Sequence, residues 1–239
     1  MLFSIINSAM NGYLREALIQ LILTIPILVI ALSFHEAAHG YVAYKCGDRT
    51  AYNLGRVTLN PAKHLDLWGM LSMFLIGYGW AKPVPINSRN FNNPKKGMAI
   101  TALAGPATNL ILAVISTIFS ALSWVLYYKS VILGIEGFRL TLIYMLYYFF
   151  FLSALYNFML MAFNLIPFPP FDGSRFALSF LPADKYFAIM RYERQILLAI
   201  IIVLFLLSRL GFSPFFWIAE KLYNLLYNPF ETLFANLIL

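Results

Sequence analysis

Two histidines and a glutamate stand close together inside a strongly apolar part of this chain. They form the run His35-Glu36-Ala37-Ala38-His39, which ends an apolar stretch that begins near residue 17. Residues four positions apart share one face of a helix, so both imidazoles can reach a single metal ion. Glu36 then lies beside the water that such an ion would hold, where it can take up a proton. The spacing therefore predicts a metal site with an adjacent base.

A catalytic zinc site needs a third protein ligand and an open position for water. Asp172 is the best candidate, because it follows prolines at 167, 169 and 170 that disfavour regular helix. Gly173 allows close backbone approach, although an Asp-Gly pair after prolines is also typical of a simple turn. The third histidine, His64, lies in a polar stretch and is not expected to be a ligand. We predict one zinc ion per chain, held by His35, His39 and Asp172.

The composition indicates which kind of scaffold carries these residues. Hydrophobic residues make up 61% of the 239 residues, charged residues make up 11%, and the mean hydropathy is +0.75. So little polar surface cannot coat a soluble globule of this size. The apolar stretches are long enough to cross ~30 Å of hydrocarbon as helices, and the alternating pattern of a membrane β-barrel is absent. We expect an all-α membrane protein with one integral-membrane domain over residues 1–239.

The apolar stretches define the expected membrane spans. We place them at 17–44, 97–128, 140–163 and 195–210. Residues 214–239 could form a fifth span or an interfacial helix. Residues 65–81 are apolar but short for a crossing and could re-enter, and residues 82–87 are interrupted by prolines and read as extended chain or a sheet edge. The result is a polytopic bundle of about four to six transmembrane helices with a short re-entrant or strand-like segment.

The basic residues indicate the orientation of the chain. The net charge is +7, but the cations are spread over loops beside apolar segments, so nucleic-acid binding is not expected. The loop 45–96 and the loop after the third span are the more basic ones. The positive-inside rule puts both on the cytoplasmic side. We therefore expect a multi-pass protein of the cell (plasma) membrane, with the end of the first span and Asp172 facing the cytoplasm.

A further polar residue, Asn109, lies in the second expected span, after Gly105 and Pro106. A lone asparagine in an apolar helix more often bridges helices by hydrogen bonding than takes part in catalysis. Gly105 and Pro106 could loosen the helix for a substrate or could permit tight packing. From spacing alone, both readings of these residues stay open.

The motifs together resemble those of the site-2 protease family of intramembrane zinc metalloproteases. The resemblance covers nearly the whole chain and is carried by the histidine run, residues 105–109 and residues 164–173. Residues 55–61 and 79–85 also resemble compact prokaryotic members. We expect neither the PDZ nor the CBS domains that many members carry.

The resemblance implies a role for each candidate residue. His35, His39 and Asp172 would bind zinc, Glu36 would be the catalytic base, and Asn109 would bind substrate or stabilise the oxyanion. The implied activity is hydrolysis of peptide bonds in or near transmembrane segments of single-span membrane proteins, within the lipid bilayer. A helical substrate hides its carbonyl groups, so it must unwind, and residues 82–87 could hold it by strand addition.

Two other classes of protein could use similar residues. A metal transporter would need further intramembrane carboxylates or histidines as relay sites, and the other expected spans contain none. A scaffold that binds membrane helices without cutting them would not need Glu36 beside its metal. Both alternatives are therefore less favoured than a peptidase.

Overall fold

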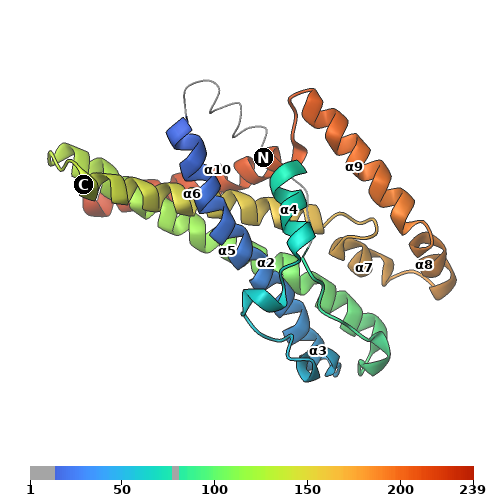
Figure 1. Ribbon diagram of the computed structural model, residues 1–239. Helices are drawn as coiled ribbons and strands as arrows, with labels where there is room; N and C mark the ends of the chain where they lie inside the picture. The colour runs from blue at the N-terminus through green and yellow to red at the C-terminus, as the bar shows by residue number, and fades with distance from the viewer. Residues whose placement is uncertain (1–13, 77–80) are drawn as a thin grey trace. The chain divides into compact units, whose positions relative to one another are not determined.

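The computed structural model of the protein describes residues 14–76 and 81–239 (Figure 1). Helices dominate, and no β-strand occurs among these residues, which confirms the predicted all-helical class. Contacts group the chain into two compact units. One comprises the described residues up to Thr108 together with Asn164–Phe205, and the other comprises Asn109–Phe163 and Leu206–Leu239. The single-domain reading of residues 1–239 stays a prediction.

Three helices of the described residues have the length and hydropathy needed to cross a membrane. They are α2 (Leu14–Lys45, of which Leu18–Lys45 meets the criteria), α5 (Pro94–Ile132) and α6 (Phe138–Asn164). A fourth candidate is the bent pair α9 (Glu193–Arg209) and α10 (Pro214–Ile238), which qualifies only as a pair. The four expected spans fall on these helices. Among the described residues, three helices qualify as spans, or four spans if the bent pair counts as one, so the lower end of the expected four to six is reached only with that pair.

Short elements join the long helices in the first unit. They are α3 (Thr50–Asn53), η1 (Pro61–Lys63), α4 (Leu67–Ile76), η2 (Ser88–Asn90), α7 (Asp172–Leu178) and α8 (Ala183–Met190). Helix α4 occupies most of the segment that we expected to re-enter, but residues 77–80 lie outside the described residues. Residues 82–87 have no regular structure, as expected for extended chain, and they join no sheet.

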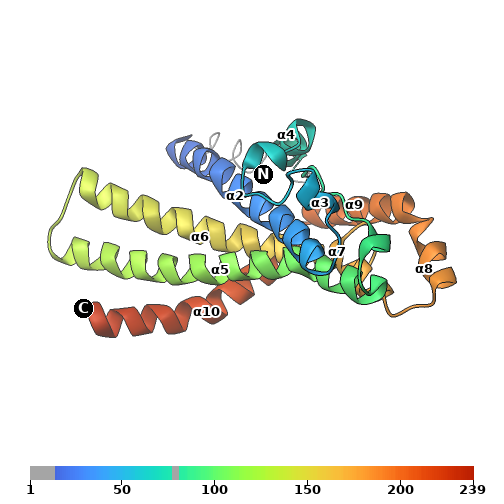
Figure 2. The same ribbon diagram turned by 90° about the horizontal axis from the view of Figure 1, so that it is seen from below.

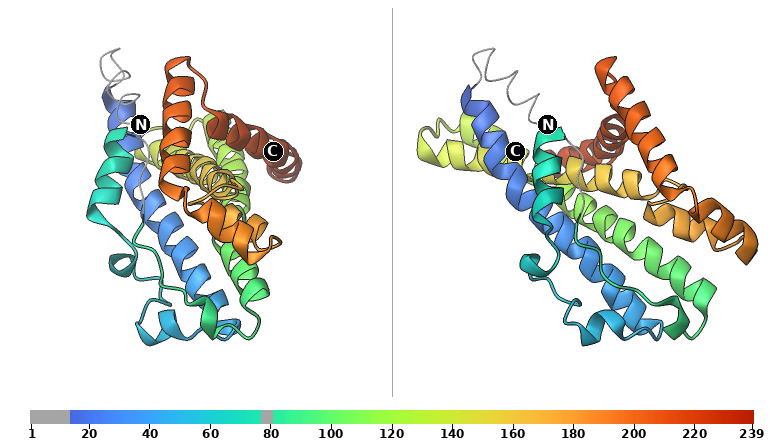
Figure 3. Two further views of the ribbon diagram at one scale, coloured as in Figure 1. Left: turned by 90° about the vertical axis from the view of Figure 1, so that its right-hand side faces the viewer. Right: turned by 45° about the vertical axis from the view of Figure 1, so that its right-hand side comes forward.

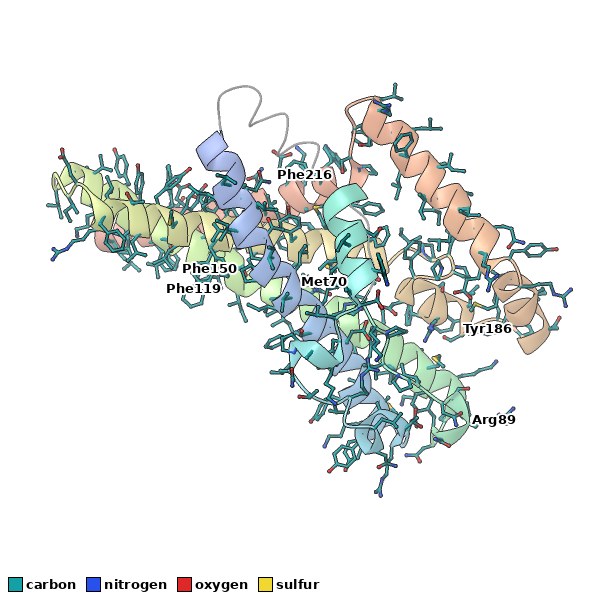
Figure 4. All side chains as sticks on the ribbon, in the orientation of Figure 1. Met70, Arg89, Phe119, Phe150, Tyr186 and Phe216 are labelled. Atoms are coloured by element: carbon teal, nitrogen blue, oxygen red, sulfur yellow. The ribbon has the colours of Figure 1, made fainter. Side chains whose placement is uncertain are left out.

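The second unit is built mainly from α6, α10 and the part of α5 that begins at Asn109, and these helices run alongside one another (Figure 2). Its core consists of buried Ala113, Ala154, Leu155, Phe158, Ala219 and Tyr223. Small residues let the helices approach, and hydroxyl pairs bridge them, as between Ser120 and Tyr223 at 2.8 Å. On the outside, the rings of Phe119 and Phe150 stack with centroids 5.1 Å apart (Figure 4).

Candidate metal centre

Three potential ligand atoms converge in the first unit, as the spacing of the histidines predicts. Nε2 of His35 and Nε2 of His39 lie 3.1 Å apart, and each lies 3.1 Å from Oδ2 of Asp172. Both histidines are buried, and Asp172 is partly buried. The structure therefore brings together the three residues that we selected from the sequence. They form the one metal-capable cluster found among the described residues.

The distances in this cluster fit one bound ion. Zinc lies ~2.0–2.2 Å from imidazole nitrogen and carboxylate oxygen, so atoms 3.1 Å apart can share it. Gly105 supplies a second observation, because a Cβ at this position would lie 2.5 Å from Nε2 of both His35 and His39. The glycine therefore leaves open the space where an ion would contact the imidazoles. This close approach favours the packing role that we considered for Gly105. Figure 3 shows from two further sides helix α2 (blue), which carries both histidines.

The hydrogen bonds around the cluster prepare His39 for metal binding. Its Nδ1 lies 2.7 Å from the carbonyl oxygen of Thr101. Because a carbonyl oxygen only accepts, Nδ1 carries the proton and donates, which leaves the lone pair of Nε2 directed at the cluster. Burial acts to raise the pKa of the Asp172 carboxyl, but the imidazoles of His35 and His39 hold that pKa well below its usual value. A charged carboxylate beside imidazole nitrogens is a good site for a divalent cation.

Asp172 reaches the cluster because of the turn that precedes α7. Phe171 is the extended N-cap residue of α7, and the hydroxyl of Ser174 donates to the carbonyl oxygen of Phe171 at 2.7 Å. A Cβ on Gly173 would lie 2.4 Å from the carbonyl oxygen of Leu165. Only glycine fits this contact, so the Asp-Gly pair does more than form a turn. It packs α7 directly against the backbone that follows α6.

Glu36 lies in the same pocket as the three ligand candidates. Its Oε2 accepts a hydrogen bond of 2.9 Å from the backbone N–H of Val84. The pocket has a volume of about 170 Å³ and is also lined by Pro83, Ile86, Asn164 and Arg175. A base, a candidate metal site and space for a peptide group therefore occur together.

The extended residues 82–87, which we name the active-site strap, are held by side chains. At its beginning, the Arg56 guanidinium donates to the carbonyl oxygens of Lys82 and Pro83, at 2.8 and 3.2 Å. At its end, the Asp48 carboxylate accepts the N–H of Asn87 at 2.7 Å. Between these anchors, Val84 donates to Glu36. The hydrogen bond from Val84 therefore ties the strap to the proposed base.

Two other sequence candidates have different surroundings. Asn109 is buried in the second unit, and its amide donates to Oδ1 of Asn157 at 2.9 Å, so it bridges α5 and α6. Its role in substrate binding stays a prediction. His64 is buried, and its Nε2 donates to the carbonyl oxygen of Thr58 at 2.7 Å. His64 lies outside the cluster, as we expected.

We did not identify Asp48 as a structural residue from the sequence. It is fully buried and accepts hydrogen bonds from Thr50, Asn87 and Asn90. One signal was present in the sequence. Asp48 follows Gly47 directly after an apolar helix, which is a typical place for a side chain that binds backbone N–H groups.

The helices and the cluster define a multi-pass membrane protein with a buried three-ligand candidate metal centre. Residues 23–208 match the family described as "Peptidase family M50". The chain belongs to peptidase family M50, and the resemblance to site-2 proteases is confirmed.

Two named relatives support this assignment. The chain is 39% identical over 157 residues to "Putative zinc metalloprotease YwhC" of Bacillus subtilis (strain 168), covering 65% of this chain and 67% of YwhC. It is 33% identical over 99 residues to "Putative zinc metalloprotease Rip2" of Mycolicibacterium smegmatis, covering 39% of this chain and 38% of Rip2. No solved structure matches the chain.

Proposed function

We propose that this protein is an intramembrane zinc endopeptidase that hydrolyses peptide bonds in or near transmembrane segments of other membrane proteins. The observation that carries the proposal is the convergence of His35, His39 and Asp172 at 3.1 Å in the pocket that holds Glu36. Membership of a peptidase family and the long apolar helices agree with it.

Zinc is the metal that best suits this donor set. Two imidazole nitrogens and one carboxylate oxygen are typical of a catalytic zinc site, which keeps its remaining position open. The names of both relatives include zinc. When bound, zinc supplies Lewis acidity that polarises a peptide carbonyl and lowers the pKa of water toward ~7.

Glu36 performs the proton transfers in the proposed reaction. Its Oε2 is held by the N–H of Val84, whereas its Oε1 has no hydrogen bond within the described part of the chain. Oε1 can therefore take the proton of the attacking water and return it to the leaving amine nitrogen. The bond from Val84 keeps the carboxylate in one orientation during both transfers.

The active-site strap is the proposed binding site for an unwound substrate. Pro83 and Pro85 have no N–H group, and the N–H of Val84 is used by Glu36. The N–H of Ile86 makes no hydrogen bond within the described residues, and Ile86 lines the pocket. A substrate strand could therefore pair at Ile86. Ile86→Pro should raise KM with little change in zinc content, and an unchanged KM would remove strand pairing at this residue.

Asn109 is proposed to bind substrate or stabilise the oxyanion, as the family resemblance implies. The proposal requires that the Asn109 amide reach a peptide carbonyl during the reaction. Asn109→Ala should then lower kcat while zinc content stays at the parent level. Full activity in this variant would reject this role for Asn109.

The pocket is proposed to open to the cytoplasm, in the cell membrane. The support is the basic character of the loop 45–96, which joins α2 to α5, and of the residues that follow α6. Water would then reach Glu36 from the cytoplasmic side of the bilayer.

The activity is tested by reconstituting the purified protein with a panel of labelled single-span membrane proteins. We expect cleavage by the parent and a loss of roughly 10²–10⁴-fold in kcat for Glu36→Gln, because a general base contributes about that much. Parent-level cleavage by the variant would reject Glu36 as the base. Zinc movement into liposomes without cleavage would favour a transporter, and substrate capture without cleavage would favour a scaffold.

A further inference from the structure

Asp48 is a buried carboxylate to which the proposed reaction assigns no role. Its side chain is fully buried, although carboxylates are almost never fully buried unless they are paired. Four donors satisfy it: the N–H and hydroxyl of Thr50, the N–H of Asn87 and the side-chain amide of Asn90. A carboxylate is costly to bury unless hydrogen bonds compensate for the loss of water. The question is therefore what this buried group does for the protein.

The donors connect two segments that are far apart in the sequence. Asp48 lies three positions beyond the end of α2, the helix that carries Glu36, and Asn87 is the last residue of the active-site strap. Nearby, the N–H of Asn92 donates to the carbonyl oxygen of Cys46 at 3.0 Å. Asp48 therefore ties the end of the helix that carries the base to the end of the strap.

The turn that carries Asp48 is shaped for this junction. Gly47 has φ of 110°, a conformation that L side chains rarely adopt. A Cβ on Gly47 would also lie 2.8 Å from Oδ1 of Asn92. Both the backbone conformation and the close approach of residues 90–92 thus require glycine beside Asp48.

The anchors control the register of the strap against Glu36. Val84 and Asn87 are only three positions apart, and an extended chain advances ~3.3 Å per residue. A slip of one residue would move the N–H of Val84 out of hydrogen-bond range of Glu36 and turn its side chain the other way. Val84 is buried, so the correct register also matters for packing.

We propose that Asp48 is a positioning residue that sets the register of the active-site strap, so that Val84 holds Glu36 and the strap lines the pocket correctly. The proposal rests on the proposed function of Glu36 as the base. Asp48 is not among the residues that line the pocket, so it acts through Asn87 and the strap. A small misplacement of the reacting groups can lower rates by about 10²-fold.

The test uses the full-length protein with Asp48→Asn, Asn90→Asp and the double exchange. In Asp48→Asn, the new amide nitrogen is a donor that faces the donors of Thr50 or Asn90, so hydrogen bonds are lost. In Asn90→Asp, two carboxylates face each other and repel. The double exchange restores one amide-carboxylate pair between positions 48 and 90. Asp66→Asn is the matched control, because Asp66 accepts the N–H of Gly69 at 2.8 Å and makes no hydrogen bond to the strap within the described residues.

Three readouts separate positioning from general stability. Amide hydrogen exchange should become faster in peptides that cover residues 82–90, but not in those that cover residues 98–108 or 172–178. Zinc content should stay at the parent level. The value of kcat/KM should fall about 10–100-fold in each single variant, recover substantially in the double exchange, and change little in Asp66→Asn.

The outcomes are decisive in each direction. Unchanged exchange over residues 82–90 in Asp48→Asn would overturn the proposal, as would loss of zinc and of folded protein in both single variants, because Asp48 would then support the whole fold. A double exchange no better than either single variant would also overturn it. If the parent itself shows no cleavage, the proposed function fails, whereas the exchange data still decide whether Asp48 holds the strap.

Discussion

At the residue scale, the candidate site depends on three side chains that converge and on Gly105, which has no side chain and so leaves space beside the two imidazoles. The pair His35 and His39 was predictable, because its spacing is a property of any helix. The position of Asp172 beside them was not, since it depends on how the turn before α7 packs 133 residues after His39. The role of Gly105 was left open for the same reason. Its closeness to both imidazoles is visible only in three dimensions.

Gly105→Ala should weaken metal binding without weakening the helix. The added Cβ would lie 2.5 Å from Nε2 of His35 and of His39, so the imidazoles must shift or the ion must leave. We expect a loss of roughly 10–100-fold in zinc affinity, as for other changes that reorient metal ligands. Zinc content after dialysis against a graded chelator measures this loss.

Thermal unfolding of the zinc-free proteins provides the control for this change. Alanine is favoured over glycine inside a helix by about 0.5–1 kcal/mol, but its Cβ crowds both imidazoles even without zinc. The zinc-free variant should therefore be less stable than the zinc-free parent by no more than about 1–3 kcal/mol and should still fold. Parent-level zinc affinity in a folded variant would show that Gly105 does not border the ion.

At the element scale, the lengths of the apolar stretches predicted the long helices well, because a membrane span needs only a long run of apolar residues in its own sequence. All four expected spans fall on helices, with ends within a few residues. The short elements between residues 46 and 93 were harder to predict, since tertiary hydrogen bonds determine them. The extended character of residues 82–87 follows from their prolines, but their contact with Glu36 depends on Asp48 and Arg56.

The stabilising effect of Asp48 should depend on pH. Burial acts to raise the pKa of Asp48, but the bonds from Thr50, Asn87 and Asn90 hold that pKa below its usual value. A carboxyl group whose pKa is lowered by folding stabilises the protein above its unfolded pKa of ~3.9 and loses this effect as the pH falls through the folded value. The Tm difference between the parent and Asp48→Asn should be constant from about pH 7 to 5.

Thermal unfolding in detergent at several pH values checks this expectation. Below about pH 4 the difference should shrink, since protonation removes the charge from Asp48 in the parent. A difference that grows on acidification would show that Asp48 is not the stabilising anion that its contacts indicate.

At the scale of the whole molecule, composition was enough to predict a multi-pass helical membrane protein. The basic loops add a prediction of orientation that the helices themselves do not test. Arg89 lies in the basic loop 45–96 and extends away from the ribbon (Figure 4). Glu136 is exposed in the short connection between α5 and α6. If α5 crosses the membrane, these two residues face opposite sides.

Cysteine labelling tests this orientation, because Cys46 is the only cysteine in the chain. Arg89→Cys and Glu136→Cys are each introduced into a Cys46→Ser background. A membrane-impermeant maleimide should label Glu136→Cys in intact cells and Arg89→Cys only in inverted vesicles. The reverse pattern would place the loop 45–96 outside the cytoplasm.

The central claim is that two imidazoles and one carboxylate bind a single catalytic zinc ion beside Glu36. The most direct measurement is the zinc content of the purified parent, Asp172→Ala and Glu36→Gln by elemental analysis. We predict one zinc ion per chain in the parent and in Glu36→Gln, and strongly reduced zinc in Asp172→Ala. Full zinc occupancy in a folded Asp172→Ala protein would contradict the account.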